Sequence, residues 1–152
     1  LDLASRIFKR LTNDSAIDTE PSWSPDGKWL VFTSDRSGKP QIYKISAQGG
    51  RAKRLTFEGD YNAHARFSPD GTQLAIAHDG KIALLNLENN QLDILTQATL
   101  DESPNFSPNG QMIIYTSGTS LSAVSVDGRV HQRLAEGLGE EVREPAWSPF
   151  EE

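Results

Sequence analysis

Residues 20–32 read EPSWSPDGKWLVF and contain a turn that recurs along the chain. The Ser-Pro-Asp-Gly sequence at 24–27 returns at 68–71, then as Ser-Pro-Asn-Gly at 107–110, and as a bare Ser-Pro pair at 148–149. The four serines stand at positions 24, 68, 107 and 148, so the repeats are 44, 39 and 41 residues long. A period of about 40 residues made of short strands is typical of a β-propeller, with one blade per repeat.

The residues around each turn favour strands that are buried on both faces. Proline presets φ at the second turn position, and glycine suits the fourth. An apolar run follows each turn, with Leu30, Leu74 and Ile113 in one column, and such runs are typical of strands covered on both sides. Four matching turns at nearly constant spacing disfavour a generic β-sandwich. We expect that apolar column to be buried between blades, together with the aromatic residue before each serine: Trp23, Phe67, Phe106 and Trp147.

The repeat predicts an all-β fold, a β-propeller of four-stranded antiparallel blades. Three complete blades are expected at about 18–56, 62–96 and 102–134, with partial strands at 1–12 and 144–150. The outer strand of a blade is expected to end at a Leu-Thr pair and to be short and partly charged, as exposed edge strands usually are. No segment shows the period of an amphipathic helix.

Composition excludes several classes of function. The formal net charge of −6 argues against nucleic acid or an anionic membrane surface as the main partner. The chain has no cysteine, which excludes disulfides and thiolate chemistry. No apolar run approaches the roughly 20 residues of a membrane-spanning helix, so direct membrane insertion is not expected. No signal peptide is recognisable at the start of the chain.

The sequence carries no recognisable catalytic motif. It has no Gly-x-Ser-x-Gly elbow, no His-Glu-x-x-His pair and no glycine-rich phosphate loop. The histidines His64, His78 and His131 fall on an inner-strand start, a second strand and an outer strand, so we do not expect them to share a metal ion. We therefore predict no enzyme activity, no catalytic residue, no metal site and no resident cofactor.

Polar residues gather just before the inner strands. Inner strands line the central channel of a propeller, so these residues should crowd one mouth of that channel. Three of the four sites carry carboxylates. A solvated loop charge explains any single one, but recurrence at one structural position favours a negative rim that receives a partner segment or a cation. The predicted partner-binding residues are Asp18, Thr19, Glu20, Tyr61, Asn62, His64, Asp101, Glu102, Arg143 and Glu144.

Several segments resemble the TolB family, the periplasmic propellers of the Tol–Pal system. The resemblance spans nearly the whole chain. It is weaker at 63–66, Ala-His-Ala-Arg, where family members tend to be acidic, and the basic residues there disfavour a calcium site. The matching segments are Thr-Glu-Pro at 19–21, Phe-Thr-Ser-Asp at 32–35, Gly-Lys-Pro-Gln-Ile-Tyr-Lys at 38–44, Leu-Thr-Phe-Glu-Gly at 55–59, Leu-Asp-Glu-Ser-Pro at 100–104 and Pro-Ala-Trp-Ser-Pro-Phe at 145–150.

This resemblance implies an architecture and a role. Members of the family have an N-terminal α/β domain and a six-bladed propeller, of which this chain would be about the C-terminal half. The mouth of the propeller channel is implied to bind the lipoprotein Pal, and colicins exploit the same mouth. A calcium ion has been associated with the channel, and other Tol proteins, TolA among them, bind through parts outside this chain. The implied setting is the periplasm of a Gram-negative cell, where the system supports outer-membrane integrity and cell division.

Two other interpretations remain open at this stage. The propeller of prolyl oligopeptidase and dipeptidyl peptidase-type serine peptidases, which gates a hydrolase domain, carries the same repeat. A catalytic elbow elsewhere in the protein would favour that alternative, whereas an α/β domain behind a signal peptide would favour TolB. A sugar- or ion-binding propeller is a weaker alternative. The partial strands at the two ends further predict either a homodimer formed through the open ends or completion of the ring by other blades.

Overall fold

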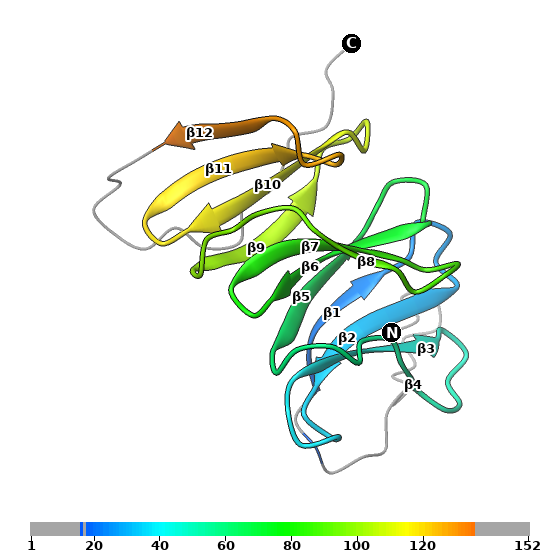
Figure 1. Cartoon of the computed structure of the whole chain (residues 1–152). Helices are drawn as coiled ribbons and strands as arrows, with labels where there is room; N and C mark the ends of the chain where they lie inside the picture. The colour runs from blue at the N-terminus through cyan, green and yellow to red at the C-terminus, as the bar shows by residue number, and fades with distance from the viewer. Residues whose placement is uncertain (1–15, 17, 136–152) are drawn as a thin grey trace.

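The computed structural model describes residue 16 and residues 18–135. These residues form twelve strands in three four-stranded antiparallel sheets, which lie side by side as successive blades (Figure 1). The all-β fold of four-stranded antiparallel blades is thus confirmed. Within the described residues, no helix is long and apolar enough to cross a membrane.

Each sheet follows the order of the sequence from an inner strand to an outer strand. Blade 1 consists of β1 (Asp18–Trp23), β2 (Trp29–Ser34), β3 (Gln41–Ser46) and β4 (Lys53–Arg54). Blade 2 consists of β5 (Asn62–Phe67), β6 (Gln73–His78), β7 (Lys81–Asn86) and β8 (Leu92–Ile94). Blade 3 consists of β9 (Asp101–Phe106), β10 (Met112–Ser117), β11 (Ser120–Ser125) and β12 (His131–Ala135).

The recurring turn is closed by one repeated set of hydrogen bonds. In blade 1 the Trp29 amide donates to Ser24 Oγ over 2.9 Å, and that hydroxyl donates to the Asp26 carboxylate over 2.6 Å. This hydrogen bond from Ser24 holds the pKa of Asp26 below its usual value. Gly27 has a φ of 71°, which glycine adopts without a steric penalty. The serine makes the same two contacts in the turns of Ser68 with Asp70 and Ser107 with Asn109. The hairpin turn between β11 and β12 uses the same pair of contacts, through Ser125 and Asp127.

The blades pack face to face through two apolar cores. Between blades 1 and 2, Val31 and Ile42 pack with Ile76, and all three are fully buried. Between blades 2 and 3, Ala75, Ile82 and Tyr115 occupy the corresponding positions. The inner strand of one blade contacts the second and third strands of the blade before it. Thus β5 lies against β2 and β3, and β9 lies against β6 and β7.

The predicted burial of the aromatic column is wrong at Trp23, which is 52% exposed. Phe67 is partly buried against the core between blades 1 and 2, and Phe106 belongs to the core between blades 2 and 3. Each of these aromatic residues therefore packs toward the preceding blade. Trp23 belongs to the first described blade, so no described sheet covers it, and its cross-strand partner Leu30 is also only partly buried. Trp147 lies outside the described residues.

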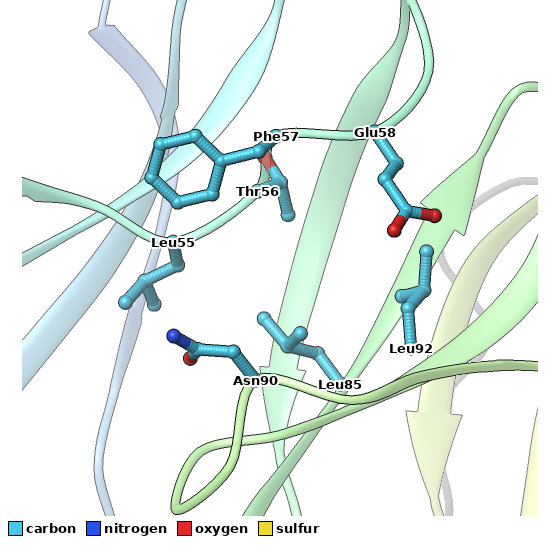
Figure 2. Close-up of a pocket in the computed structure, with 7 residues that line it drawn as sticks. All are labelled: Leu55, Thr56, Phe57, Glu58, Leu85, Asn90 and Leu92. Atoms are coloured by element: carbon cyan, nitrogen blue, oxygen red, sulfur yellow. The ribbon is translucent and has the colours of Figure 1, made fainter.

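The Leu-Thr pairs follow the outer strands and lie outside them. Leu55 is buried just after β4, and the Thr56 hydroxyl accepts a hydrogen bond from the Ile42 amide over 3.0 Å. After β8, Leu95 is likewise buried, and the Thr96 hydroxyl accepts a hydrogen bond from the Ile82 amide. A small cavity of about 100 Å³ lies beside the first pair, between residues of blades 1 and 2. Its lining, drawn in Figure 2, combines apolar side chains such as Leu55 and Leu85 with polar ones such as Glu58 and Asn90.

Candidate binding site at the mouth of the channel

Each inner strand is irregular near its start, where the predicted site residues lie. The pairing between inner and second strand shifts register there in all three blades. One residue in each irregularity has a left-handed backbone although it is not glycine: Glu20 with φ 56°, His64 with φ 55° and Ser103 with φ 53°. Such conformations cost on the order of 1–3 kcal/mol and cluster at functional sites. We call these three residues the bulge positions.

Two of the bulge positions are in direct contact. Nδ1 of His64 contacts the Glu20 carboxylate, which joins blade 2 to blade 1. Burial acts to raise the pKa of Glu20, but the hydrogen bond and the charge of His64 hold that pKa below its usual value. Glu20 is therefore an ionised group held in a fixed position by its neighbour.

Tyr61 and Glu102 extend this charged surface. Burial raises the pKa of Tyr61, and the negative charges of Glu20 and Glu102 raise it further, so the phenol lies in the field of both carboxylates. Glu102 is exposed, and so is Thr19, whose hydroxyl approaches Glu20 Oε1 at 3.5 Å. Glu20, Tyr61, His64 and Glu102 come from all three blades, and we call them the mouth cluster.

Asp18, another predicted rim residue, is paired within its own blade. Its carboxylate accepts two hydrogen bonds from the Arg36 guanidinium, at 2.9 and 3.0 Å. That guanidinium also lies over the rings of Phe32 and Tyr43, with its carbon 5.3 and 4.9 Å from the ring centroids. The charge of Asp18 is therefore neutralised where it stands, and the residue fixes the loop that carries Arg36.

Asn62 is fully buried and connects blade 2 to blade 1. Its amide nitrogen donates to Gln41 Oε1 over 3.0 Å and to the Glu58 carbonyl over 2.7 Å, while its oxygen lies 2.7 Å from His78 Nδ1. Every polar atom of the side chain is thus engaged inside the protein. Asn62 therefore has a structural role beneath the mouth, and its side chain has no polar atom left to bind another protein.

Asp101 occupies the same place in blade 3 but is not satisfied in this way. It is 1% exposed, and neither carboxylate oxygen has a hydrogen-bond partner among the described residues. Burial raises the pKa of Tyr115, and the negative charge of Asp101 adds to this effect. The three equivalent positions therefore carry an ion pair, a hydrogen-bonded amide and a carboxylate that has no hydrogen-bond partner in the described part of the chain.

The predicted site is thus divided into two layers. Thr19, Glu20, Tyr61, His64 and Glu102 lie at or near the surface, whereas Asn62 and Asp101 are buried beneath it. Asp18 is partly exposed, but its carboxylate is paired with Arg36. Arg143 and Glu144 lie outside the described residues. In the described part of the chain, no group of three or more histidine, aspartate or glutamate side chains is arranged to hold a metal ion.

Two residues of this region were missed by reasoning from residue type. Ser103 is neutral, but its alignment with Glu20 and His64 in the repeat would have placed it at a bulge position. Arg36 lies in a turn at the far end of β2, and only the antiparallel pairing of Asp18 with Ser34 brings it back to the inner strand. No local signal in the sequence reveals that contact.

Comparison with known proteins identifies the family. The family model of the TolB β-propeller domain matches residues 1–151. The chain belongs to the TolB β-propeller family. The Tol-Pal system protein TolB of Bordetella pertussis is 49% identical over 151 residues, which cover 94% of this chain and 34% of that protein. TolB of Nitrosococcus oceani is 58% identical over 85 residues, which cover 51% of this chain and 19% of that protein.

Solved structures agree with this assignment. The crystal structure of TolB from Acinetobacter baumannii matches with a TM-score of 0.83 and 47% identity, covering 99% of this chain and 40% of that one. An oligogalacturonate lyase from Vibrio parahaemolyticus matches with a TM-score of 0.62 at 17% identity, which shows a shared fold alone. The chain spans about a third of the length of the curated TolB proteins it matches. Membership in the TolB family favours the TolB interpretation over a peptidase-gating propeller.

Proposed function

We propose that this chain is a non-catalytic protein-binding module of the Tol–Pal system, and that its channel mouth binds the lipoprotein Pal. The setting is the periplasm of a Gram-negative cell, where the complex supports outer-membrane integrity and cell division. Colicin translocation segments use the same mouth, and other Tol proteins bind parts of the protein outside this chain. The proposal requires no bound metal or other cofactor.

The observation that carries this proposal is the mouth cluster. Glu20 and Glu102 come from different blades, and both act on the phenol of Tyr61. Glu20 lies at the bulge position of β1, and Glu102 stands directly before the bulge position of β9. Backbone strain repeated at one position is typical of a site under functional constraint. The assignment to the Tol–Pal system rests on relatives such as the Tol-Pal system protein TolB that is 49% identical to this chain.

The chemistry of the cluster defines the partner segment. Two carboxylates, of which Glu102 is exposed, attract cationic side chains and hydrogen-bond donors. Charges at the rim of an interface steer encounters more than they hold complexes together. The two carboxylates should therefore act mainly by increasing the association rate of Pal. Added salt should weaken it, since the Debye length is about 8 Å at physiological ionic strength.

The test is titration calorimetry with the soluble domain of Pal. We expect the double variant Glu20→Gln/Glu102→Gln to bind about tenfold more weakly than the parent at low ionic strength, which corresponds to about 1.4 kcal/mol. The difference should shrink at about 0.5 M salt, where screening is strong. Melting curves of the variant check that the blades remain folded.

A matched control removes two charges elsewhere. Glu88→Gln/Asp93→Asn changes the net charge equally, but both residues are exposed on the outer hairpin of blade 2. This control should bind Pal like the parent. Equal binding by the mouth variant and the parent at low salt would refute the role of the mouth cluster.

A further inference from the structure

A larger hollow lies at the opposite ends of the inner strands. Its volume is about 470 Å³, within the range of roughly 300–1,000 Å³ typical of ligand pockets. It lies where the inner strands run into the recurring turns, so each blade contributes an aromatic residue and a proline. We call it the turn-end pocket. Its apolar wall consists of Trp23, Phe67, Phe106, Pro25, Pro69 and Pro108.

The wall of this pocket is preformed. A methyl group added to Gly71 would touch Pro25 Cδ at 3.6 Å, and one added to Gly110 would touch Pro69 Cδ at 3.4 Å, so the turns of neighbouring blades are in close contact. Each of these turns is also closed by the hydrogen bonds of its serine. A ligand would therefore meet a surface that needs little ordering on binding, which favours affinity.

Arg66 gives the pocket a positive charge. It stands one residue before Phe67 at the end of β5 and is partly buried. Within the described part of the chain, no acidic side chain is placed to form an ion pair with it. A guanidinium that has lost part of its hydration and has no ion pair attracts an anion, and its planar donors match a carboxylate in particular.

The residues equivalent to Arg66 in the other blades are also polar and line the same pocket. They are Ser22 in β1 and Asn105 in β9. A pocket with a mainly apolar wall and a few converging polar groups is the usual form of a binding site. Grooves lined by aromatic residues take extended, often proline-containing, peptide segments.

We propose that the turn-end pocket binds a carboxylate side chain of an extended peptide segment that carries an apolar residue beside it. The carboxylate pairs with Arg66, and the apolar neighbour packs on Phe67 and Trp23. This site goes beyond the proposed function, because it lies at the other end of the inner strands and selects the opposite charge. The occupant is a peptide because the pocket is lined by an aromatic residue and a proline from each of three successive blades, and aromatic-lined grooves of this kind take extended segments.

The experiment uses acetylated and amidated tripeptides as probes. Pro-Glu-Phe carries the required carboxylate, and Pro-Gln-Phe is its neutral counterpart. Binding is followed through the indole N–H signal of Trp23 in NMR spectra of isotope-labelled protein. Titration of this signal gives the dissociation constant of each peptide. We expect the acidic peptide to bind at least fivefold more tightly than the neutral one, and added salt to reduce this difference in affinity.

Variants of the arginine give a second measurement. Arg66→Gln should lower the affinity for Pro-Glu-Phe to that of the neutral peptide, and Arg66→Lys should retain part of the preference. Arg51→Gln is the matched control, because Arg51 is exposed and does not line the pocket. The Glu20→Gln/Glu102→Gln variant should bind the peptide normally, which separates this site from Pal binding.

Three results would overturn the proposal. One is absence of binding by the acidic peptide, and another is equal binding of the two peptides to the parent. The third is an unchanged affinity in a folded Arg66→Gln variant. Because the comparison of the two peptides uses only the parent protein, the proposal stays testable even where a variant fails to fold.

Discussion

Replacing Asp101 by asparagine is expected to stabilise the protein. The Asp101 carboxylate is 1% exposed, and both of its oxygens lack hydrogen-bond partners among the described residues. Burying an unsatisfied polar group costs about 1–3 kcal/mol, and more when the group is charged. Asparagine has nearly the same shape, and blade 2 already carries an amide at the equivalent position, Asn62. Asparagine keeps a buried polar group but removes the additional cost of the charge, so we expect a gain in unfolding free energy of about 1 kcal/mol.

Urea denaturation and thermal melting at neutral pH measure this change. For a chain of this length the melting temperature should rise by about 2–4 °C for each kcal/mol. Glu88→Gln is the control, because it removes the same charge from an exposed site on the turn between β7 and β8. The control separates the effect of burial from the effect of lowering the net charge of −6.

One outcome would refute the reasoning. If Asp101→Asn loses more than about 1 kcal/mol while Glu88→Gln is neutral, then the buried carboxylate is stabilised by a partner that makes its charge favourable. Asp101 would then resemble Asp18, whose charge is neutralised by Arg36, and not the uncharged Asn62.

Three further predictions concern the core, the mouth and one turn. Ile76→Ala should cost about 2–5 kcal/mol in urea denaturation, because Ile76 is fully buried between blades 1 and 2. The pKa of Glu20 is lowered in the folded state, so its ionised form contributes stability that is complete above its ordinary value of 4.5 and is lost as the pH falls through the folded-state pKa. Acid titration of the unfolding free energy should therefore show a smaller loss below pH 4.5 for Glu20→Gln than for the parent. Gly80→Ala should destabilise more than Gly118→Ala in thermal melts, because both glycines have a positive φ but only at Gly80 would the new methyl group overlap a backbone oxygen, that of Thr99; equal losses would mean that the loop of Thr99 moves aside.

The fold could be predicted from the sequence because its key element is local. The hydrogen bonds of the recurring turn join residues at most five positions apart, such as Ser24 and Trp29. Local chemistry of this kind is visible in a short stretch of sequence, and its repetition reports the number of blades. The apolar runs after each turn then indicate burial on both faces, as found for Leu74 and Ile113.

Contacts between distant segments could not be predicted in this way. The exposure of Trp23 depends on which blade precedes it, although its local sequence matches that of Phe106. The pairing of Asp18 with Arg36 depends on how the second strand returns along the first. The acidic residues before the inner strands were recognised, but which of them are buried, such as Asp101, and which are exposed, such as Glu102, depends on how each inner strand is covered by its neighbours.

The charge of the turn-end pocket could not be predicted from local sequence either. Arg66 was visible in the sequence as a basic residue just before an aromatic residue and the recurring turn. Its position beside Ser22 and Asn105 follows only from the stacking of three blades. A cluster assembled from residues about 40 positions apart needs the aligned repeats before it can be seen at all.

The bulge positions have a consequence for how such a protein diversifies. Glu20, His64 and Ser103 share one backbone conformation but present a carboxylate, an imidazole and a hydroxyl. The backbone conformation at these positions therefore accommodates three different side chains. Mutation can exchange one sector of the recognition surface at a time while the neighbouring sectors keep their shape, so a lineage can follow a changing partner without rebuilding its scaffold.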